Sequence, residues 1–509
     1  MVHEMKKTSL RYHIAGVVAL AAGLWVVTGG LPASAAAGNV VSAASPAAAG
    51  SDPAPARQLS EIERAAAAIT SRIALPDIPQ DRLFNVVDYG SVSADRRDDR
   101  PAFRQAIAAA SQAGGGVVIV PAGHYYIAGP LQLASHIELR LEKGACIEFS
   151  NRPQDYEHDI VLTRFESTEV YNYSPLIYAY GCEDIAITST GGEREGIIDG
   201  NGSAWWPWVG AGAWKGCSPN QQAASEELKD MGNSDVPVKD RVFGRGKYLR
   251  PVLLQPYACK RVLIKGVCIK DSPMWNVAPV LSEDVTIDNV DITADGPNTD
   301  GVDPDACSNV WIKNSRFTTG DDCIAIKSGR DDDGRRVGVA SSNIVIENNV
   351  FRDGHGGVTC GSEMAGGIDH VYSLNNVMDS PNLRWAYRLK TNSLRGGGVT
   401  DFYAYGDRIE RVERAVLTVD MGYAGGDIGS YTPDIHGIHM ENLQVKLHHA
   451  PLATVETYER NPVYDFTWRN CQLKGAGSHL FRLENTPPEN ITVSSMNIDG
   501  QLHDGHGNM

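Results

Sequence analysis

Aspartates gather in two neighbouring segments of the chain, residues 296–305 (GPNTDGVDPD) and residues 319–329 (TGDDCIAIKSG). Asp321 and Asp322 follow Asp300 by 21 and 22 residues. If this interval is one turn of a repeating coil, the three side chains stand one strand spacing apart, about 4.8 Å. Carboxyl groups so crowded repel one another, which raises the pKa of at least one of them. A protonated carboxyl beside ionised ones is what acid–base hydrolysis requires.

A histidine and two cations follow at similar intervals. His355, in Gly-His-Gly-Gly, lies about one further coil beyond Asp322, and Arg388 follows His355 at the same interval. Arg388 and Lys390 are two residues apart, so both side chains point to the same side of a strand. We therefore predict acids, a histidine and two cations on consecutive coils, with the cations holding an anionic substrate.

Each of these groups also has an ordinary structural interpretation. Asp-Asp pairs and Asn-Thr-Asp-Gly are common turn sequences, and His355 between glycines can cap a bend. Arg388 and Lys390 can be ion-pair partners of the aspartates. Residues 331–333 (DDD), which precede Gly334, are predicted to form only a solvated turn. The four clusters in register favour a functional site, because unrelated turns would not share one spacing.

The positions of these residues depend on a repeat that runs through most of the chain. Short strands of the type apolar-x-apolar begin at Ile185, Val262, Val285, Val310, Ile344, Val371, Phe402, Phe466 and Ile491. Between Val262 and Phe402 the successive starts are separated by intervals from the low twenties to the middle thirties. A period in this range, built from short strands without helices, indicates a solenoid of stacked β-coils. We predict a single-domain, all-β parallel β-helix.

Asparagines support this architecture, because they recur at about the same point of each unit: Asn289, Asn314, Asn348, Asn349, Asn375 and Asn376. Asparagine tolerates a left-handed turn and can hydrogen-bond to its neighbour in the next coil. A leucine-rich horseshoe is disfavoured because the repeats lack its leucine pattern. A β-propeller is disfavoured because its blades need roughly 40 or more residues.

The composition excludes several classes of protein. The 509 residues are 42% hydrophobic and 21% charged, which is typical of neither a disordered chain nor a coiled coil. A net charge of −16 argues against generic binding to nucleic acid or to an anionic membrane. The nine cysteines form no C-x-x-C pair, so we predict no zinc site and assign no disulfide. Cys323 and Cys360 are expected to be small buried fillers.

The N-terminal segment has the three parts of a secretory signal. Lys6, Lys7 and Arg11 precede an apolar run over residues 14–27, and Ala-Ser-Ala at residues 33–35 provides a cleavage site. We predict a signal peptide over residues 1–35 and a secreted protein, extracellular or periplasmic. A single membrane anchor is the alternative, which the cleavage site and the Ala/Ser/Pro-rich stretch after it disfavour.

Three regions follow from these patterns: the signal peptide (1–35), a linker and N-terminal segment (36–80), and a β-helix (81–500). Short helices are expected near 58–74 and 99–112. The stretch between Ile185 and Val262 is much longer than one repeat. Part of this stretch must be an inserted loop, and loops on a solenoid usually cluster on one face.

At the candidate site the sequence resembles glycoside hydrolase family 28, the polygalacturonases and their relatives. Four family signatures occur in order, as Asn-Thr-Asp-Gly from Asn298, Gly-Asp-Asp from Gly320, Gly-His-Gly from Gly354 and Arg-Leu-Lys from Arg388. The last has Leu where Ile is more usual. The resemblance runs from about Phe84 to about residue 470 and implies a right-handed parallel β-helix.

The resemblance also implies roles for individual residues. Asp321 would be the general acid, while Asp300 and Asp322 would activate the attacking water. His355 would support the protonation state of the acid or contact substrate, and Arg388 and Lys390 would bind a galacturonate carboxylate. Further substrate contacts are expected at Tyr423 and Asn298.

The implied activity is inverting hydrolysis of α-1,4-galacturonosyl linkages in polygalacturonate, without a metal or cofactor. An inserted loop near residues 203–250 could close one end of the cleft, which predicts an exo-acting enzyme. Rhamnogalacturonan or rhamnoside hydrolysis is the alternative within the family. Two further alternatives are a calcium-dependent pectate lyase, with calcium near residues 331–333, and a non-catalytic glycan-binding β-helix. The oligomeric state stays open.

Overall fold

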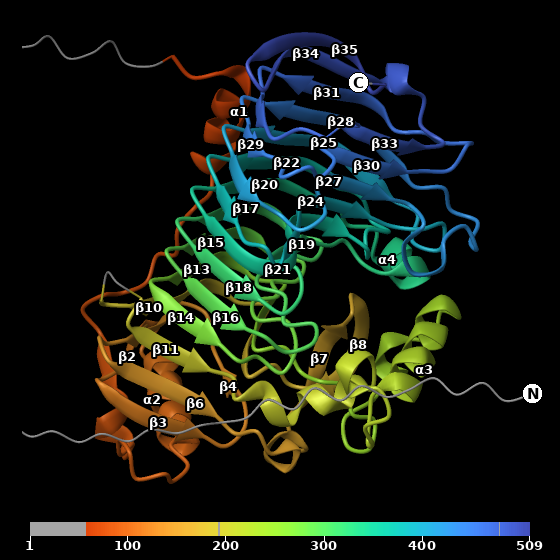
Figure 1. Cartoon of the computed structure of the whole chain (residues 1–509). Helices are drawn as coiled ribbons and strands as arrows, with labels where there is room; N and C mark the ends of the chain where they lie inside the picture. Colours follow the sequence, from red (N-terminus) through yellow and green to blue (C-terminus); the bar gives the residue numbers. More distant parts are fainter. Residues whose placement is uncertain (1–57, 192–193, 478, 509) are drawn as a thin grey trace, which may run out of the picture. The chain divides into compact units, whose positions relative to one another are not determined.

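The computed structural model describes residues 58–191, 194–477 and 479–508. The predicted signal peptide and most of the predicted linker lie outside these residues. One compact body extends over Leu59–Met509, and short strands of successive coils stack side by side within it (Figure 1). Nearly all of the pairings are parallel, so the chain forms the predicted right-handed parallel β-helix.

Three strand faces enclose the apolar core, and each is a ladder of parallel strands. The first face contains β1 (Leu83–Asn85), β2 (Gly116–Val120), β5 (Ile137–Leu141), β10 (Glu183–Ser189), β13 (Lys260–Lys265), β15 (Glu283–Asp288), β17 (Ser308–Lys313), β20 (Ser341–Glu347), β22 (Ile368–Leu374), β25 (Gly398–Tyr405), β28 (Asp434–Glu441), β31 (Tyr464–Arg469) and β34 (Ile491–Ile498). Nine of these strands, the first of them β10, carry the apolar-x-apolar pattern from which the repeat is predicted.

The second face follows each of these strands across a corner. It contains β3 (Gly123–Ile127), β6 (Ala145–Phe149), β11 (Gly196–Asp199), β14 (Val267–Lys270), β16 (Asp291–Ala294), β18 (Arg316–Thr319), the start of β21 (Val350–Gly361), β23 (Val377–Asp379), β26 (Arg408–Arg411), β29 (Gln444–Lys446) and β32 (Gln472–Lys474).

The third face positions the candidate site. It contains β4 (Leu131–Gln132), β9 (Ile177–Tyr180), β12 (Leu254–Tyr257), β19 (Ile324–Ile326), the end of β21, β24 (Leu383–Lys390), β27 (Ala415–Asp420), β30 (Ala453–Glu456) and β33 (Phe481–Glu484). Between β12 and β19 the ladder continues as single bridges, from Leu254 to Val277, then to Val302 and Ile324.

The predicted repeat has the correct register on the first face. Val262 pairs with Val285, which pairs with Val310, and the same ladder continues through Ile344 and Val371. It reaches Phe402 on β25. The sequence pattern did not predict one strand of the ladder, β28. Its Ile438 pairs with Phe402 of β25 on one side and with Phe466 of β31 on the other. The sequence of β28, DIHGIHME, contains a glycine and two histidines, which obscure the apolar alternation.

The asparagines mark the corner between the first and second faces, as predicted. Asn314, Asn348 and Asn375 have φ values of 54–57°, in the left-handed region. The asparagines that follow them point inward and link the coils, because the Asn349 N–H donates to Asn376 Oδ1 at 2.9 Å. Asn376 N–H donates in turn to Asp407 Oδ1 at 2.6 Å. This ladder satisfies buried polar groups at the corners of these consecutive coils.

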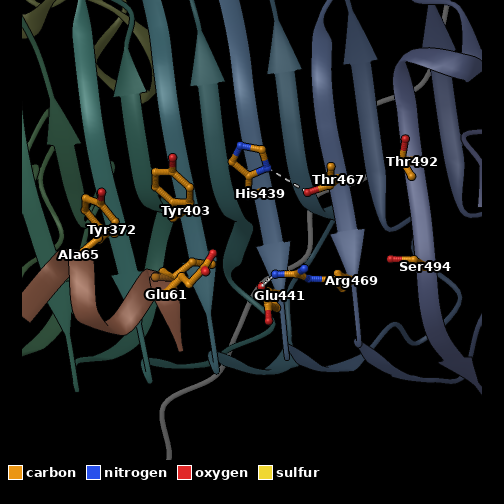
Figure 2. Close-up of a pocket in the computed structure, with 11 residues that line it drawn as sticks. Glu61, Ala65, Tyr372, Tyr403, His439, Glu441, Thr467, Arg469, Thr492 and Ser494 are labelled. Atoms are coloured by element: carbon orange, nitrogen blue, oxygen red, sulfur yellow. Dashed lines mark hydrogen bonds and ion pairs between the residues drawn. The ribbon is translucent and has the colours of Figure 1, made fainter. Parts of the chain in front are cut away.

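Two predicted helices are confirmed near the start of the body. α1 (Glu61–Thr70) begins with a capping box, in which Ser60 and Glu63 exchange hydrogen bonds. α2 (Arg100–Gln112) packs against β1 and β2. Figure 2 shows α1 beside the outer side of the first face, next to Tyr372, whose ring stacks on that of Tyr403 with centroids 4.9 Å apart.

Other elements depart from the repeat. β7 (Ile160–Phe165) and β8 (Thr168–Tyr173) form an antiparallel hairpin, and α3 (Gln222–Asn233) lies in the predicted insertion. Ile185 pairs directly with Val262, so the long stretch between their starts makes a single coil that carries an insertion. β35 (Gln501–His506) turns back antiparallel to β34. In the described part of the chain, no helix is long and apolar enough to span a bilayer.

The stretch 331–333 contradicts the prediction of a solvated turn. These residues begin α4 (Asp331–Val337), and the side chains of Asp331 and Asp333 are buried. Arg395 lies 2.5 Å from Asp331, and Arg241 of the insertion lies 2.6 Å from Asp333. The arginines come from distant segments of the chain, so the local sequence could not indicate that they would draw this turn into the protein.

The cysteines agree with the sequence interpretation. All nine have free thiols. Cys323 and Cys360 are completely buried in the core, as predicted for small fillers.

Candidate active site

The third face brings the predicted acids together on adjacent coils. The bridge from Val302 to Ile324 places the segment of Asp300 beside that of Asp321 and Asp322. Hydrogen bonds fix this stacking, since the N–H of Gly301 donates to the carbonyl of Asp322 at 3.0 Å. Carboxylate oxygens of the three aspartates lie within 4.8 Å of one another. The predicted spacing of one coil is therefore correct.

The three carboxyl groups differ in their surroundings. Asp300 is 4% exposed, and the side chain of Asp322 has no exposed surface, whereas that of Asp321 is 19% exposed. Burial raises the pKa of Asp300 well above its ordinary value, and the charges of Asp303 and Asp321 raise it further. Asp300 is therefore the member of the trio that holds a proton most tightly.

Asp322 is bound by both predicted cations. Its Oδ2 lies 2.7 Å from Lys390 Nζ, and its Oδ1 lies 3.3 Å from Arg388 Nη1. Burial raises the pKa of Asp322, but Lys390 and Arg388 outweigh burial and hold it well below its ordinary value. Arg388 and Lys390 are therefore ion-pair partners of an aspartate, as the structural interpretation predicts. They also lie beside the acids, as the functional interpretation predicts.

His355 contacts the acid that precedes Asp322. Its Nδ1 lies 2.8 Å from Asp321 Oδ1, and its backbone N–H donates to the carbonyl of Asp321 at 3.0 Å. Burial raises the pKa of Asp321, but the hydrogen bond and charge of His355 outweigh it and leave the pKa lowered. The equal spacing from Asp322 to His355 and from His355 to Arg388 suggests that His355 and Arg388 are neighbours in register. In the structure, Arg388 pairs with Thr359 instead.

Aromatic rings hold the cations in place. The Arg388 guanidinium lies 4.7 Å from the centroid of the Trp385 ring and 5.3 Å from that of Tyr423. Lys390 Nζ lies 5.0 Å from the Tyr423 centroid. The structure thus brings Tyr423 to the predicted site. Sequence reasoning missed Trp385, because the alternation along a strand places a residue three positions before Arg388 on the opposite side.

Asn298 lines the same hollow and is held by the insertion. It has φ = 55°, and its Oδ1 accepts a 2.7 Å hydrogen bond from Arg250 Nη2. Arg250 is 1% exposed and also donates to the carbonyls of Pro273 and Pro297, at 3.1 and 2.8 Å. The insertion therefore fixes the loop that leads to Asp300.

A second layer of buried charges lies beside the trio, and sequence reasoning missed it. Lys327 Nζ lies 3.5 Å from Asp303 Oδ1 and 3.4 Å from Glu363 Oε2. Burial raises the pKa of Asp303 well above its ordinary value despite the opposing charge of Lys327. Asp303 and Lys327 belong to the two aspartate-rich segments, 296–305 and 319–329. Their pairing could not be predicted because it depends on how the coils stack.

The site occupies a hollow of about 180 Å³, whose lining includes Asp300, Asp321, Lys390 and Tyr423. Glu166, at the tip of the β7–β8 hairpin, lies on one side and pairs with Arg330 at 2.5 Å. α3 packs against α4 and β8, so the insertion, the hairpin and α4 form one wall.

Comparisons with known proteins agree with these observations. Residues 244–495 match the family described as glycosyl hydrolases family 28, and residues 83–140 match one described as rhamnogalacturonase A/epimerase, pectate lyase-like. A solved hyperthermoactive exopolygalacturonase from Thermotoga maritima is 38% identical, with a TM-score of 0.81. The similarity covers 88% of this chain and 99% of that one.

Two curated relatives are more distant. A probable polygalacturonase of Vitis vinifera is 30% identical over 334 residues, which are 63% of this chain and 60% of the relative. An exo-poly-α-D-galacturonosidase of Dickeya chrysanthemi is 27% identical over 382 residues, which are 69% of this chain and 59% of the relative. The chain thus spans about 60% of the length of these two relatives.

Proposed function

Because the chain belongs to glycosyl hydrolase family 28, we propose that it hydrolyses the α-1,4-galacturonosyl linkages of polygalacturonate. The observation that carries this proposal is the placement of three carboxyl groups beside Lys390 and Arg388. Carboxyl groups in different protonation states supply an acid and a base. Cations in the same hollow provide the attraction that a substrate with one carboxylate per sugar requires.

Asp321 is proposed as the general acid, because it is the most exposed of the trio and can reach a glycosidic oxygen. Lys390 contributes to its lowered pKa. A substrate carboxylate paired with Lys390 offsets that contribution and raises the pKa of Asp321. Since neighbouring carboxyl groups titrate as a unit, we infer that substrate binding shifts one proton from Asp300 to Asp321. Asp300 and Asp322 then hold and activate the attacking water.

His355 and the aromatic residues have supporting roles in this proposal. The contact of His355 with Asp321 keeps the acid oriented and adjusts its protonation. Tyr423 and Asn298 line the hollow and are proposed to contact the sugar. Arg388 and Lys390 would meet the carboxylate of the galacturonate next to the scissile bond.

Inversion at the anomeric carbon is proposed from the family resemblance. The three carboxylates lie closer together than the roughly 6.5–9.5 Å typical of inverting glycosidases. The distance between the carboxylates therefore does not support inversion in this protein. Proton NMR of the first-formed product decides, since inversion yields the β-anomer from an α-linkage.

Exo action is proposed because a wall stands beside the hollow. The insertion, the β7–β8 hairpin and α4 pack together, and the Glu166–Arg330 pair lies on the lining. A wall on one side of a cleft would stop a polymer there and restrict attack to a chain end. The exo-acting relatives agree with this proposal.

The lyase alternative loses its proposed calcium ligands. Asp331 and Asp333 face Arg395 and Arg241 at 2.5 and 2.6 Å, so guanidinium groups lie where the cation would bind. Secretion remains a proposal that rests on residues 1–35, and the substrate, an extracellular cell-wall polymer, suits that location.

The test is to incubate the protein with unesterified polygalacturonate and to resolve the products by size and anomer. Galacturonate or a single short product supports exo action, whereas a ladder of oligomers indicates an endo enzyme. Products that absorb in the ultraviolet would indicate a lyase, and cleavage of rhamnogalacturonan alone would indicate the family alternative. Asp321→Asn should abolish hydrolysis and retain binding. Asp295→Asn, at an exposed aspartate nearby, is the matched control.

A further inference from the structure

A row of carboxylates continues along the third face beyond the cations of the site. Lys390 on β24 pairs in register with Asp420 on β27, Asp420 with Glu456 on β30, and Glu456 with Glu484 on β33. Figure 1 shows these four strands side by side. Successive coils therefore present one cation and then three acids, each about one strand spacing from the next.

These acids line a groove of about 310 Å³, and its Asp420 pairs in register with Lys390 of the site. A parallel row of Thr418, Thr454 and Arg482 forms its other side. Among the described residues, no Lys, Arg or His forms an ion pair within 4.0 Å of the three acids. Arg482 is the one cation on the lining, so the groove keeps a net negative charge.

The acids of the row act on one another. Burial raises the pKa of Glu456, and the charges of Asp420 and Glu484 raise it further. Burial also raises the pKa of Asp420, while the charge of Arg388 opposes this effect. Asp420 thus lies within the electrostatic field of Arg388.

We propose that Asp420, Glu456 and Glu484 form an electrostatic barrier that disfavours unesterified galacturonate units beyond the Arg388–Lys390 pair. This inference rests on the proposed function, because it assumes a substrate with one carboxylate per sugar. Each additional charged sugar would meet a further carboxylate of the row, which costs binding free energy. The site would therefore favour short oligogalacturonates, and chains that are methyl-esterified on this side, over long unesterified chains.

The experiment compares digalacturonate with hexagalacturonate for the parent protein and the double variant Glu456→Gln/Glu484→Gln. Both glutamates are exposed, so the folded structure should tolerate the change. In about 20 mM salt, kcat/KM for hexagalacturonate should rise by roughly twofold to tenfold and that for digalacturonate should stay constant. The gain should shrink in about 0.5 M salt, because exposed charges are screened.

Two control variants test whether charge in the groove changes hexagalacturonate hydrolysis in the expected direction, and whether only acids inside the groove matter. Arg482→Gln removes the cation of the groove and should lower the hexagalacturonate value. Glu489→Gln neutralises an exposed acid outside the groove and should change neither value. An unchanged ratio of hexagalacturonate to digalacturonate in the double variant would overturn the barrier.

A binding measurement separates this inference from the proposed function. Calorimetry with both oligomers is carried out in an Asp321→Asn background, with and without the two glutamine substitutions. Absence of hydrolysis in the parent protein would reject the proposed function. The affinity ratio still tests the barrier in that case, since it should shift toward hexagalacturonate only when the glutamates are replaced, and a constant ratio rejects it.

Discussion

Lys390 Nζ lies 2.7 Å from Oδ2 of Asp322, a carboxyl group with no exposed surface. The contact joins two coils of the third face, since Lys390 belongs to β24 and Asp322 lies just before β19. It keeps one acid of the trio ionised while burial favours the proton on another. The same cation faces the hollow, so it couples the charge state of the acids to the arrival of an anionic substrate.

Replacing Lys390 by Met should reduce both stability and activity. The substitution leaves a buried carboxylate with Arg388 as its remaining cation, and loss of one partner of a buried pair costs about 3–5 kcal/mol. Urea unfolding should show this decrease, and kcat on trigalacturonate should fall at least tenfold. Lys474→Met, at an exposed lysine on β32 for which no ion pair is seen in the part of the chain that the structure describes, is the control and should leave both quantities unchanged. Parent-like unfolding of the Lys390 variant would contradict the coupling.

Asp322 should make stability depend on pH in acid. Its pKa is lowered in the folded protein, and the unfolded chain titrates at about 3.9. The ionised pair therefore contributes stability above about pH 4, and this contribution disappears as the pH falls toward the folded pKa. The difference in free energy of unfolding between the parent protein and Asp322→Asn should be constant above about pH 5 and shrink progressively as the pH falls below it. A constant difference would argue that Asp322 titrates normally.

Trp385 is expected to act through Arg388. In Trp385→Leu the guanidinium loses one of the two rings near it, and a cation–π contact contributes about 0.5–2 kcal/mol. KM for trigalacturonate should rise by roughly twofold to thirtyfold, with a smaller change in kcat. Steady-state kinetics measures both, and Trp385→Phe should restore most of the affinity. An effect on kcat alone would assign the tryptophan a different role.

Arg250 should matter although it lies in the insertion. Arg250→Met removes the hydrogen bond to Asn298 and leaves the carbonyls of Pro273 and Pro297 without their donor. An unsatisfied buried group costs about 1–3 kcal/mol. The free energy of unfolding should decrease by at least this amount and kcat should fall about tenfold or more. Arg245→Met, at an exposed arginine in the same insertion, should resemble the parent protein.

The repeat could be predicted because its signal is local. The strands of the first face point apolar side chains into the core with a period of two, and an asparagine at the corner marks the end of several of them. These features are enough to place Val262, Val285 and Val310 in register. The strand β28 could not be predicted because its histidines and glycine interrupt the alternation of apolar residues. Its Ile438 nevertheless lies in the same ladder.

The site could be predicted in part for the same reason. One coil separates Asp300 from Asp321 and Asp322, so their proximity follows from the period. The partners of Lys327 and Asp331 depend on which distant coils and loops meet, and no local pattern encodes this. The run of three aspartates illustrates the limit, because a turn composition became a helix only through arginines at positions 241 and 395.

β35 has a consequence for how copies of the chain meet. A solenoid ends in a strand whose hydrogen-bonding groups could recruit another molecule. Here β34 is paired by β35 in the opposite direction, so the last parallel strand offers no template for continuing the stack. The new edge is six residues long and carries Asp504 and two histidines, a poor surface for strand addition. The reversal of direction therefore closes this edge of β34 to the addition of a parallel strand from another molecule.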